Sequence, residues 1–232
     1  MTPFRKYIIT ILLSFIFTQV YCQTNLSTHS PINLKLTVLD TLKVENKSMI
    51  INVLWLSDTI KINILNQDKK TDTSSLENIE HKGYFASKGY VLSDETSIQN
   101  CFSYALEKYF ENNETFSQNI FRKTTSIKSE SLEKILRNSF KVITEFSTTP
   151  RKNLKKTIPN DVLLAFVNNF GWIIHTVYYR DEIFYTKNGM FEPNTFKSLN
   201  KFIKKTYWDT EHIIVYKIDD DKIKTKLNNL AR

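Results

Sequence analysis

Glycine, proline and cysteine are scarce in this chain of 232 residues, which contains 4, 5 and 2 of them respectively. So few turn-forming residues exclude a collagen-like repeat and a low-complexity linker protein. The glycines, at positions 83, 89, 171 and 189, are too far apart for a dinucleotide-binding fingerprint or a phosphate-binding loop. Hydrophobic residues make up 41% of the chain and aromatic residues 13%. The composition therefore indicates one compact core, with a small N-terminal addition at this length.

Positive charge is in modest excess, because 32 Lys and Arg face 24 Asp and Glu and give a net charge of +8. Loss of a leader that contains Arg5 and Lys6 would leave 8 − 2 = +6. This dispersed surplus suits an anionic cell-surface polymer as well as a nucleic acid, so charge alone selects no partner. Since a solvated loop explains the basic run at residues 151–156, we predict no nucleic-acid partner.

The one marked apolar run lies near the N-terminus. Tyr7–Phe17 follows two basic residues and is shorter than the roughly 20 residues that span a bilayer. Val20 and Cys22 are small residues at −3 and −1, which predicts a signal peptide over residues 1–22. An uncleaved anchor and a lipoprotein are the alternatives, although Tyr21 is bulky for a lipoprotein signal. We therefore predict a secreted or periplasmic protein with no membrane span after cleavage.

The remaining chain divides by its apolar patterns. Residues 23–65 alternate in the manner of strands and predict a small antiparallel meander, and residues 66–80 are polar enough to be a linker. We expect one domain over residues 81–232, with helices first and an antiparallel sheet after them, an α+β fold. The predicted helices are 98–112, 131–146 and 197–205, and the predicted strands are 32–38, 49–56, 59–65, 161–167, 172–179, 182–187 and 211–218.

Cys101 is the one cysteine left after signal cleavage, and it falls in the first turn of the helix predicted over 98–112. Unpaired N–H groups and the positive end of the helix dipole stabilise a thiolate there and can hold an oxyanion. A buried, inert thiol is the alternative. His175 shares its predicted strand face with Ile173 and Val177 and so points inward. Alone it would be a core residue, but in combination with Cys101 it is a candidate general base.

Three stretches of the sequence resemble the NlpC/P60-like branch of the papain-like cysteine peptidases. They are Asn100-Cys-Phe-Ser-Tyr-Ala-Leu106, Pro159-Asn-Asp-Val-Leu-Leu-Ala-Phe166 and Trp172-Ile-Ile-His-Thr-Val-Tyr-Tyr179. The resemblance covers about residues 100–218. It implies N-terminal helices packed on an antiparallel sheet, here preceded by the small β-rich segment. The family commonly has Asp-Cys-Ser-Gly at the nucleophile, where this chain has Asn100-Cys-Phe-Ser103.

The resemblance also implies roles for the residues. Cys101 would attack an amide carbonyl, and His175 would act as general base and then acid. A two-residue turn at positions 181–182 places Asn188 opposite His175, where it would orient the imidazole. Thr186 and Glu192 are the alternatives for that third residue.

Two amides beside the nucleophile complete the predicted site. Gln99 and Asn100 are candidates to donate to the oxyanion or the substrate, although Asn100 is better explained as a helix cap. No cofactor or metal is predicted, because the cluster over residues 209–212 holds a single histidine and lacks a metal-binding spacing.

The resemblance favours an exported cysteine hydrolase that cleaves an amide bond in peptidoglycan stem peptides. Transfer of the acyl group to another acceptor would use the same residues. The rival hypothesis is a secreted, non-catalytic binding or interaction module, in which the cysteine and the histidine are simply buried.

Overall fold

A computed structural model describes residues 32–33, 37–44, 48–65, 91, 93, 97–113, 116–117, 120–150, 154 and 157–230. They belong to one compact unit, residues 32–232. The predicted signal peptide and linker lie outside the described residues. The elements are β1 (Ile32–Asn33), β2 (Thr37–Val44), β3 (Ser48–Trp55), β4 (Asp58–Leu65), α4 (Cys101–Glu111), β5 (Phe116–Ser117), β6 (Thr125–Ser126), α5 (Ser129–Ser139), β7 (Phe140–Ser147), β8 (Val162–Asn168), β9 (Ile173–Arg180), β10 (Ile183–Thr186), β11 (Asn194–Phe196), α6 (Leu199–Thr206), β12 (Thr210–Ile218) and α7 (Asp220–Leu230).

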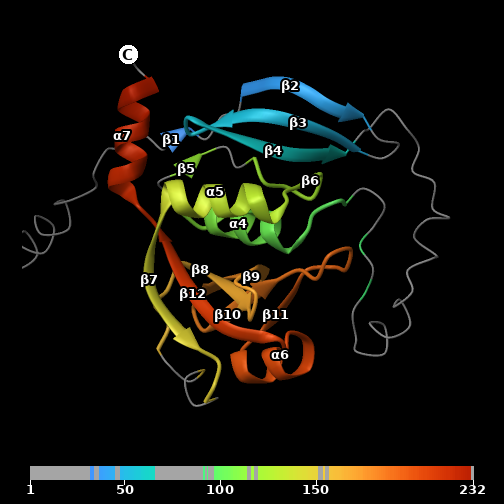
Figure 1. The fold of residues 1–232 in the computed structure, drawn as a ribbon, viewed down its shortest axis with the longest axis vertical. Helices are drawn as coiled ribbons and strands as arrows, with labels where there is room; N and C mark the ends of the chain where they lie inside the picture. Colours follow the sequence, from blue (N-terminus) through green and yellow to red (C-terminus); the bar gives the residue numbers. More distant parts are fainter. Residues whose placement is uncertain are drawn as a thin grey trace, which may run out of the picture. The chain divides into compact units, whose positions relative to one another are not determined.

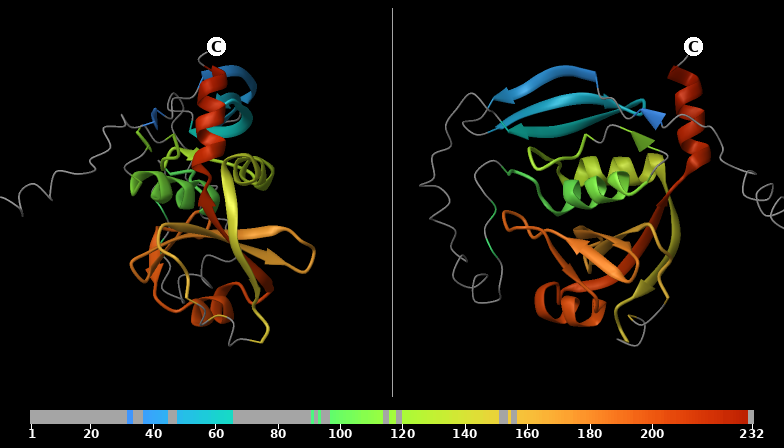
Figure 2. Two further views of the ribbon diagram at one scale, coloured as in Figure 1. Left: turned by 90° about the vertical axis from the view of Figure 1, so that its left-hand side faces the viewer. Right: turned by 180° about the vertical axis from the view of Figure 1, so that it is seen from behind.

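Two antiparallel sheets enclose a layer of helices. One sheet has the order β2-β3-β4-β6 and the other the order β11-β10-β9-β8-β12-β7. Helices α4 and α5 lie between the sheets, and α6 covers the opposite face of the six-stranded sheet (Figures 1 and 2). The α+β prediction is therefore confirmed. Among the described helices, none has both the length and the apolar character needed to cross a membrane.

The first core joins the N-terminal sheet to the helices. Trp55 at the end of β3 is fully buried, with its ring edge-on to Phe110 at 5.7 Å and to Phe121 at 5.6 Å. Leu106 of α4 and Ile135 of α5 belong to the same hydrophobic cluster. The β-rich segment thus shares a continuous core with residues that lie beyond the predicted linker.

The second core lies on the other face of the six-stranded sheet. Along β8, Leu163 and Ala165 face the first core, whereas Leu164 and Phe166 face the second, beside α6. Because helices cover both faces, all seven residues of β8 are buried. Side chains that alternate along one strand therefore enter two separate environments.

Two sequence-based predictions of secondary structure need correction. The helix predicted over 131–146 ends at Ser139, and Phe140–Ser147 is instead strand β7, paired with β12. Val142, Ile143 and Thr144 are β-branched and favour a strand. The final helix α7 was not predicted, whereas the short helix expected over 197–205 is confirmed as α6.

Candidate functional site

Cys101 begins helix α4, as the sequence predicts. Asn100 is the N-cap residue: its side-chain Oδ1 accepts from the Ser103 N–H at 3.1 Å, and Ser103 Oγ accepts from the Asn100 N–H at 3.3 Å. This reciprocal capping satisfies two of the N–H groups that a helix start leaves unpaired. The thiol is therefore held at a well-defined helix N-terminus.

The surroundings of Cys101 oppose ionisation of its thiol. Burial raises the pKa of Cys101 to about 12, although nearby backbone N–H groups and the Lys187 ammonium lower it. The residue as a whole retains partial exposure. Across the helix–sheet contact, the Thr176 hydroxyl donates to the Cys101 carbonyl at 3.2 Å. The residue that faces Cys101 from β9 is thus Thr176, and the thiol is protonated at neutral pH.

The imidazole of His175 points to the opposite face of the sheet. It is fully buried, stacks on Tyr207 at 4.1 Å between ring centroids, and contacts Phe166 and Phe202 of the second core. Its Nε2 hydrogen-bonds to Thr186 Oγ1 at 2.7 Å, and its Nδ1 has no hydrogen-bond partner among the described residues. Burial lowers the pKa of His175 to about 3, so the ring is neutral at neutral pH.

A bulge in β9 separates Ile173 from the face that His175 occupies. Phe166 of β8 pairs with His175, but its neighbour Val167 pairs with Ile173, so one extra residue is inserted in β9. Ile173 therefore faces the first core, whereas Ile174 and His175 face the second. The prediction that Ile173 and His175 share a face is wrong, and the inferred Cys101–His175 couple is not formed.

The predicted register of the next hairpin is correct, but its consequence differs. Arg180 pairs with Ile183 across the turn. Asn188 nevertheless does not orient His175, because its Oδ1 accepts from the Tyr207 hydroxyl at 2.6 Å. Thr186, one of the two alternatives, is the residue that hydrogen-bonds the imidazole.

Other predicted site residues have local partners. Gln99 is buried and donates from Nε2 to Glu107 Oε2 at 2.8 Å. Asn100 donates from Nδ2 to the Ile127 carbonyl at 2.6 Å, besides capping α4. Glu192, the second alternative to Asn188, donates its backbone N–H to the Val91 carbonyl. The side-chain amides of Gln99 and Asn100 thus donate hydrogen bonds within the protein and do not point to a substrate site.

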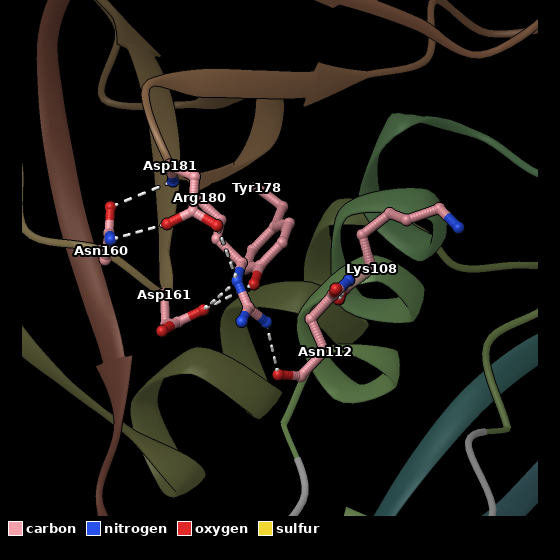
Figure 3. A network of polar contacts seen from close by, with 7 residues as sticks. All are labelled: Lys108, Asn112, Asn160, Asp161, Tyr178, Arg180 and Asp181. Atoms are coloured by element: carbon pink, nitrogen blue, oxygen red, sulfur yellow. Dashed lines mark hydrogen bonds and ion pairs between the residues drawn. The ribbon is translucent and has the colours of Figure 1, made fainter.

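A polar network that the sequence did not reveal fixes the β9–β10 hairpin against α4 (Figure 3). Arg180 Nη1 donates to the Asn112 carbonyl, at the C-terminal end of α4, at 2.9 Å. The Tyr178 hydroxyl donates to Asp161 Oδ1 at 2.7 Å, and Asp181 exchanges hydrogen bonds with Asn160. The network includes no thiol or imidazole, so its geometry indicates a structural role.

Three large aromatic side chains are exposed near one end of the six-stranded sheet. Phe170 and Trp172 lie in the β8–β9 turn, 70% and 66% exposed, and Trp208 precedes β12 at 80%. Asn168 Oδ1 accepts from the N–H groups of Phe170 and Trp172 at 3.1 and 3.0 Å, which fixes that turn. Thr210 pairs with Asn168, and this brings the two turns to the same end.

Among the described residues, no group of three or more His, Cys, Asp or Glu side chains is placed to hold a metal ion. Comparison of the chain with protein-family models, with curated proteins and with solved structures finds no match. The chemistry of the residues themselves is therefore the basis for assigning a function.

Proposed function

We propose that this chain is an exported, non-catalytic binding or interaction module on a papain-like scaffold. The observation that carries the proposal is the separation of Cys101 from His175 by the six-stranded sheet. A thiol that stays protonated and an imidazole that stays neutral, on different faces, cannot exchange a proton. Their roles are structural: Cys101 joins α4 to β9, and His175 joins β9 to β10.

The exposed aromatic residues support a binding role. Trp is enriched among the residues that dominate the energetics of protein interfaces, and exposed apolar patches mark interaction sites. Phe170 and Trp172 are presented on a hydrogen-bonded turn, with ring centroids 5.5 Å apart. Such a turn loses little conformational entropy on binding, which favours affinity.

The second candidate is a cysteine hydrolase or acyl transferase acting on peptidoglycan stem peptides. It is favoured by the position of Cys101 in the first turn of α4 and by the partial exposure of this residue. Either activity requires the His175 imidazole to face helix α4. The scaffold is compatible with the resemblance, since α4 packs on β8, β9 and β10.

Alkylation of Cys101 separates the two candidates. Iodoacetamide labelling, quantified on the peptide that contains Cys101, is measured from pH 5 to 9 in the wild type and in His175→Gln. We expect slow labelling below pH 8 that is unaffected by the substitution and becomes fast on unfolding in urea. Rapid labelling near pH 6 that His175→Gln slows would overturn the proposal and favour the hydrolase or acyl transferase.

A further inference from the structure

A pocket of about 380 Å³ separates helix α6 from strands β10 and β11. It lies on the face of the sheet that contains His175. None of its described lining residues is acidic. They include Thr186, Phe196, Lys197, Lys201, Phe202 and Lys205.

Positive charge gathers around the pocket. Lys197, Lys201 and Lys205 line it, and among the described residues neither Lys197 nor Lys201 forms an ion pair. Lysines around a concave surface without a carboxylate produce a positive potential, which attracts an anion. The lysines therefore favour a negatively charged ligand.

The buried wall of the pocket offers a hydrogen-bond donor. Thr186 is only 2% exposed, and His175 Nε2 is the one hydrogen-bond partner of its hydroxyl among the described residues. A proton on Nδ1 would be a buried donor without an acceptor, which is rarer in proteins than an unpaired acceptor. We therefore assign the imidazole proton to Nε2, which donates to Thr186 Oγ1. The Thr186 O–H then has no protein acceptor among the described residues and is free to donate to a ligand.

The remaining wall is apolar, and its Phe196 ring is stacked on both faces, because the ring of Phe184 also lies parallel to it at 4.7 Å between centroids. The rings of Phe196 and Phe202 are stacked at 3.9 Å with an interplanar angle of 7°. Both line the same pocket as the lysines. A ligand that bears an anionic group beside an apolar body would therefore satisfy both parts of the pocket.

We propose that this pocket binds a small ligand that carries a carboxylate or phosphate on an apolar body. The ammonium groups and the Thr186 hydroxyl would bind the oxyanion, and the phenyl rings would contact the body. His175 would act as a positioning residue, because it fixes the direction of the Thr186 hydroxyl. This inference names a ligand class for the binding module and rests on the proposed function.

The test uses benzoate, phenyl phosphate and neutral benzamide, titrated into the ¹⁵N-labelled protein at low salt. At least one anion should bind about tenfold or more tightly than benzamide, with shifts of the Thr186, Thr195 and Phe202 amide signals. The tighter anion identifies carboxylate or phosphate as the preferred group. Equal affinity for benzamide, or no shift at these residues, would overturn the proposal. Labelling of Cys101 is an independent readout, so a failure here is distinguishable from a failure of the proposed function.

Variants of Lys201 and Thr186 test which side chains of the pocket contact the ligand. Lys201→Gln should weaken binding of the preferred anion several-fold and reduce its salt dependence, whereas Lys141→Gln, on exposed β7, should leave both unchanged. Thr186→Val should weaken binding and Thr186→Ser should restore it. Equal binding by Thr186→Val and the wild type would contradict the role of the hydroxyl, and an unchanged affinity in Lys201→Gln would contradict that of the ammonium.

Discussion

Cys101 and His175 lie on opposite faces of the six-stranded sheet, although Thr176, the next residue after His175, hydrogen-bonds the Cys101 carbonyl at 3.2 Å. Successive residues of a strand point to opposite faces, so a one-residue shift decides which of the two meets the thiol. The pairing of His175 with Phe166 and of Thr176 with Ala165 turns His175 towards the second core and Thr176 towards α4. The register of β9 on β8 thus separates a catalytic arrangement from a structural one.

His175 should make the stability of the protein depend on pH. Its pKa is about 3 in the folded chain, against an ordinary value of 6.5, so the unfolded chain binds a proton first as the pH falls. The stability due to the neutral ring is present above about pH 6.5 and is lost towards pH 3, by at most about 1.4 kcal/mol per pH unit. Urea unfolding from pH 7 to 4 measures this slope, and His175→Gln should flatten it. Parallel slopes in the two proteins would refute the assignment.

The N-terminal sheet should be indispensable for folding, because Trp55 fills the core between β3 and the helices. Trp55→Ala should lower the free energy of unfolding by about 3 to 5 kcal/mol. The matched control is Trp208→Ala, at an 80% exposed position, which should change it by no more than about 0.5 kcal/mol. A chain limited to residues 81–232 should likewise not unfold cooperatively. A sharp transition in that shorter chain would show that the sheet is dispensable.

The three tryptophans should differ in their access to solvent. Trp172 and Trp208 are exposed, whereas Trp55 is fully buried. Acrylamide should quench the fluorescence of Trp172 and Trp208 in the folded protein and leave a blue-shifted component from Trp55. Trp55→Phe should remove that protected component. If the double variant Trp172→Phe/Trp208→Phe were quenched as strongly as the wild type, the exposed aromatic surface would not exist.

The hydroxyl of Tyr178 should stabilise the hairpin network of Figure 3. It donates to Asp161 at 2.7 Å, and the residue is buried. Tyr178→Phe should therefore cost about 1 to 2 kcal/mol in urea unfolding. Tyr179→Phe is the control in the same strand, because the Tyr179 hydroxyl has no hydrogen bond within the described part of the chain. Equal effects of the two substitutions would contradict the network.

Much of the fold is predictable from local patterns, and the candidate site is not. The cap at Asn100, the helix at Cys101 and the Arg180–Ile183 register follow from residue types and short-range spacing. The orientation of His175 depends instead on the register between β8 and β9, two strands that are buried on both faces. No alternation of polar and apolar residues remains there to reveal which face a side chain takes.

The wrong prediction of a helix over residues 140–146 has a related cause. Residues 140–147 continue the apolar spacing of helix α5, but pairing with β12 outweighs that spacing. The partner of Asn188 was similarly hidden, because Tyr207 comes from a distant turn and donates its hydroxyl to Asn188 Oδ1. Contacts between distant parts of the chain therefore determine these features, which local patterns do not predict.

The most direct test of the central claim is an NMR titration of the His175 imidazole between pH 5 and 8, in the wild type and in Cys101→Ser. A thiolate paired with an imidazolium would raise the pKa of the histidine, and loss of the thiol would lower it again. We predict that the His175 signals do not titrate in this range and do not change with Cys101→Ser. A His175 transition between pH 5 and 8 that shifts when Cys101 is replaced would contradict the account and establish a coupled pair.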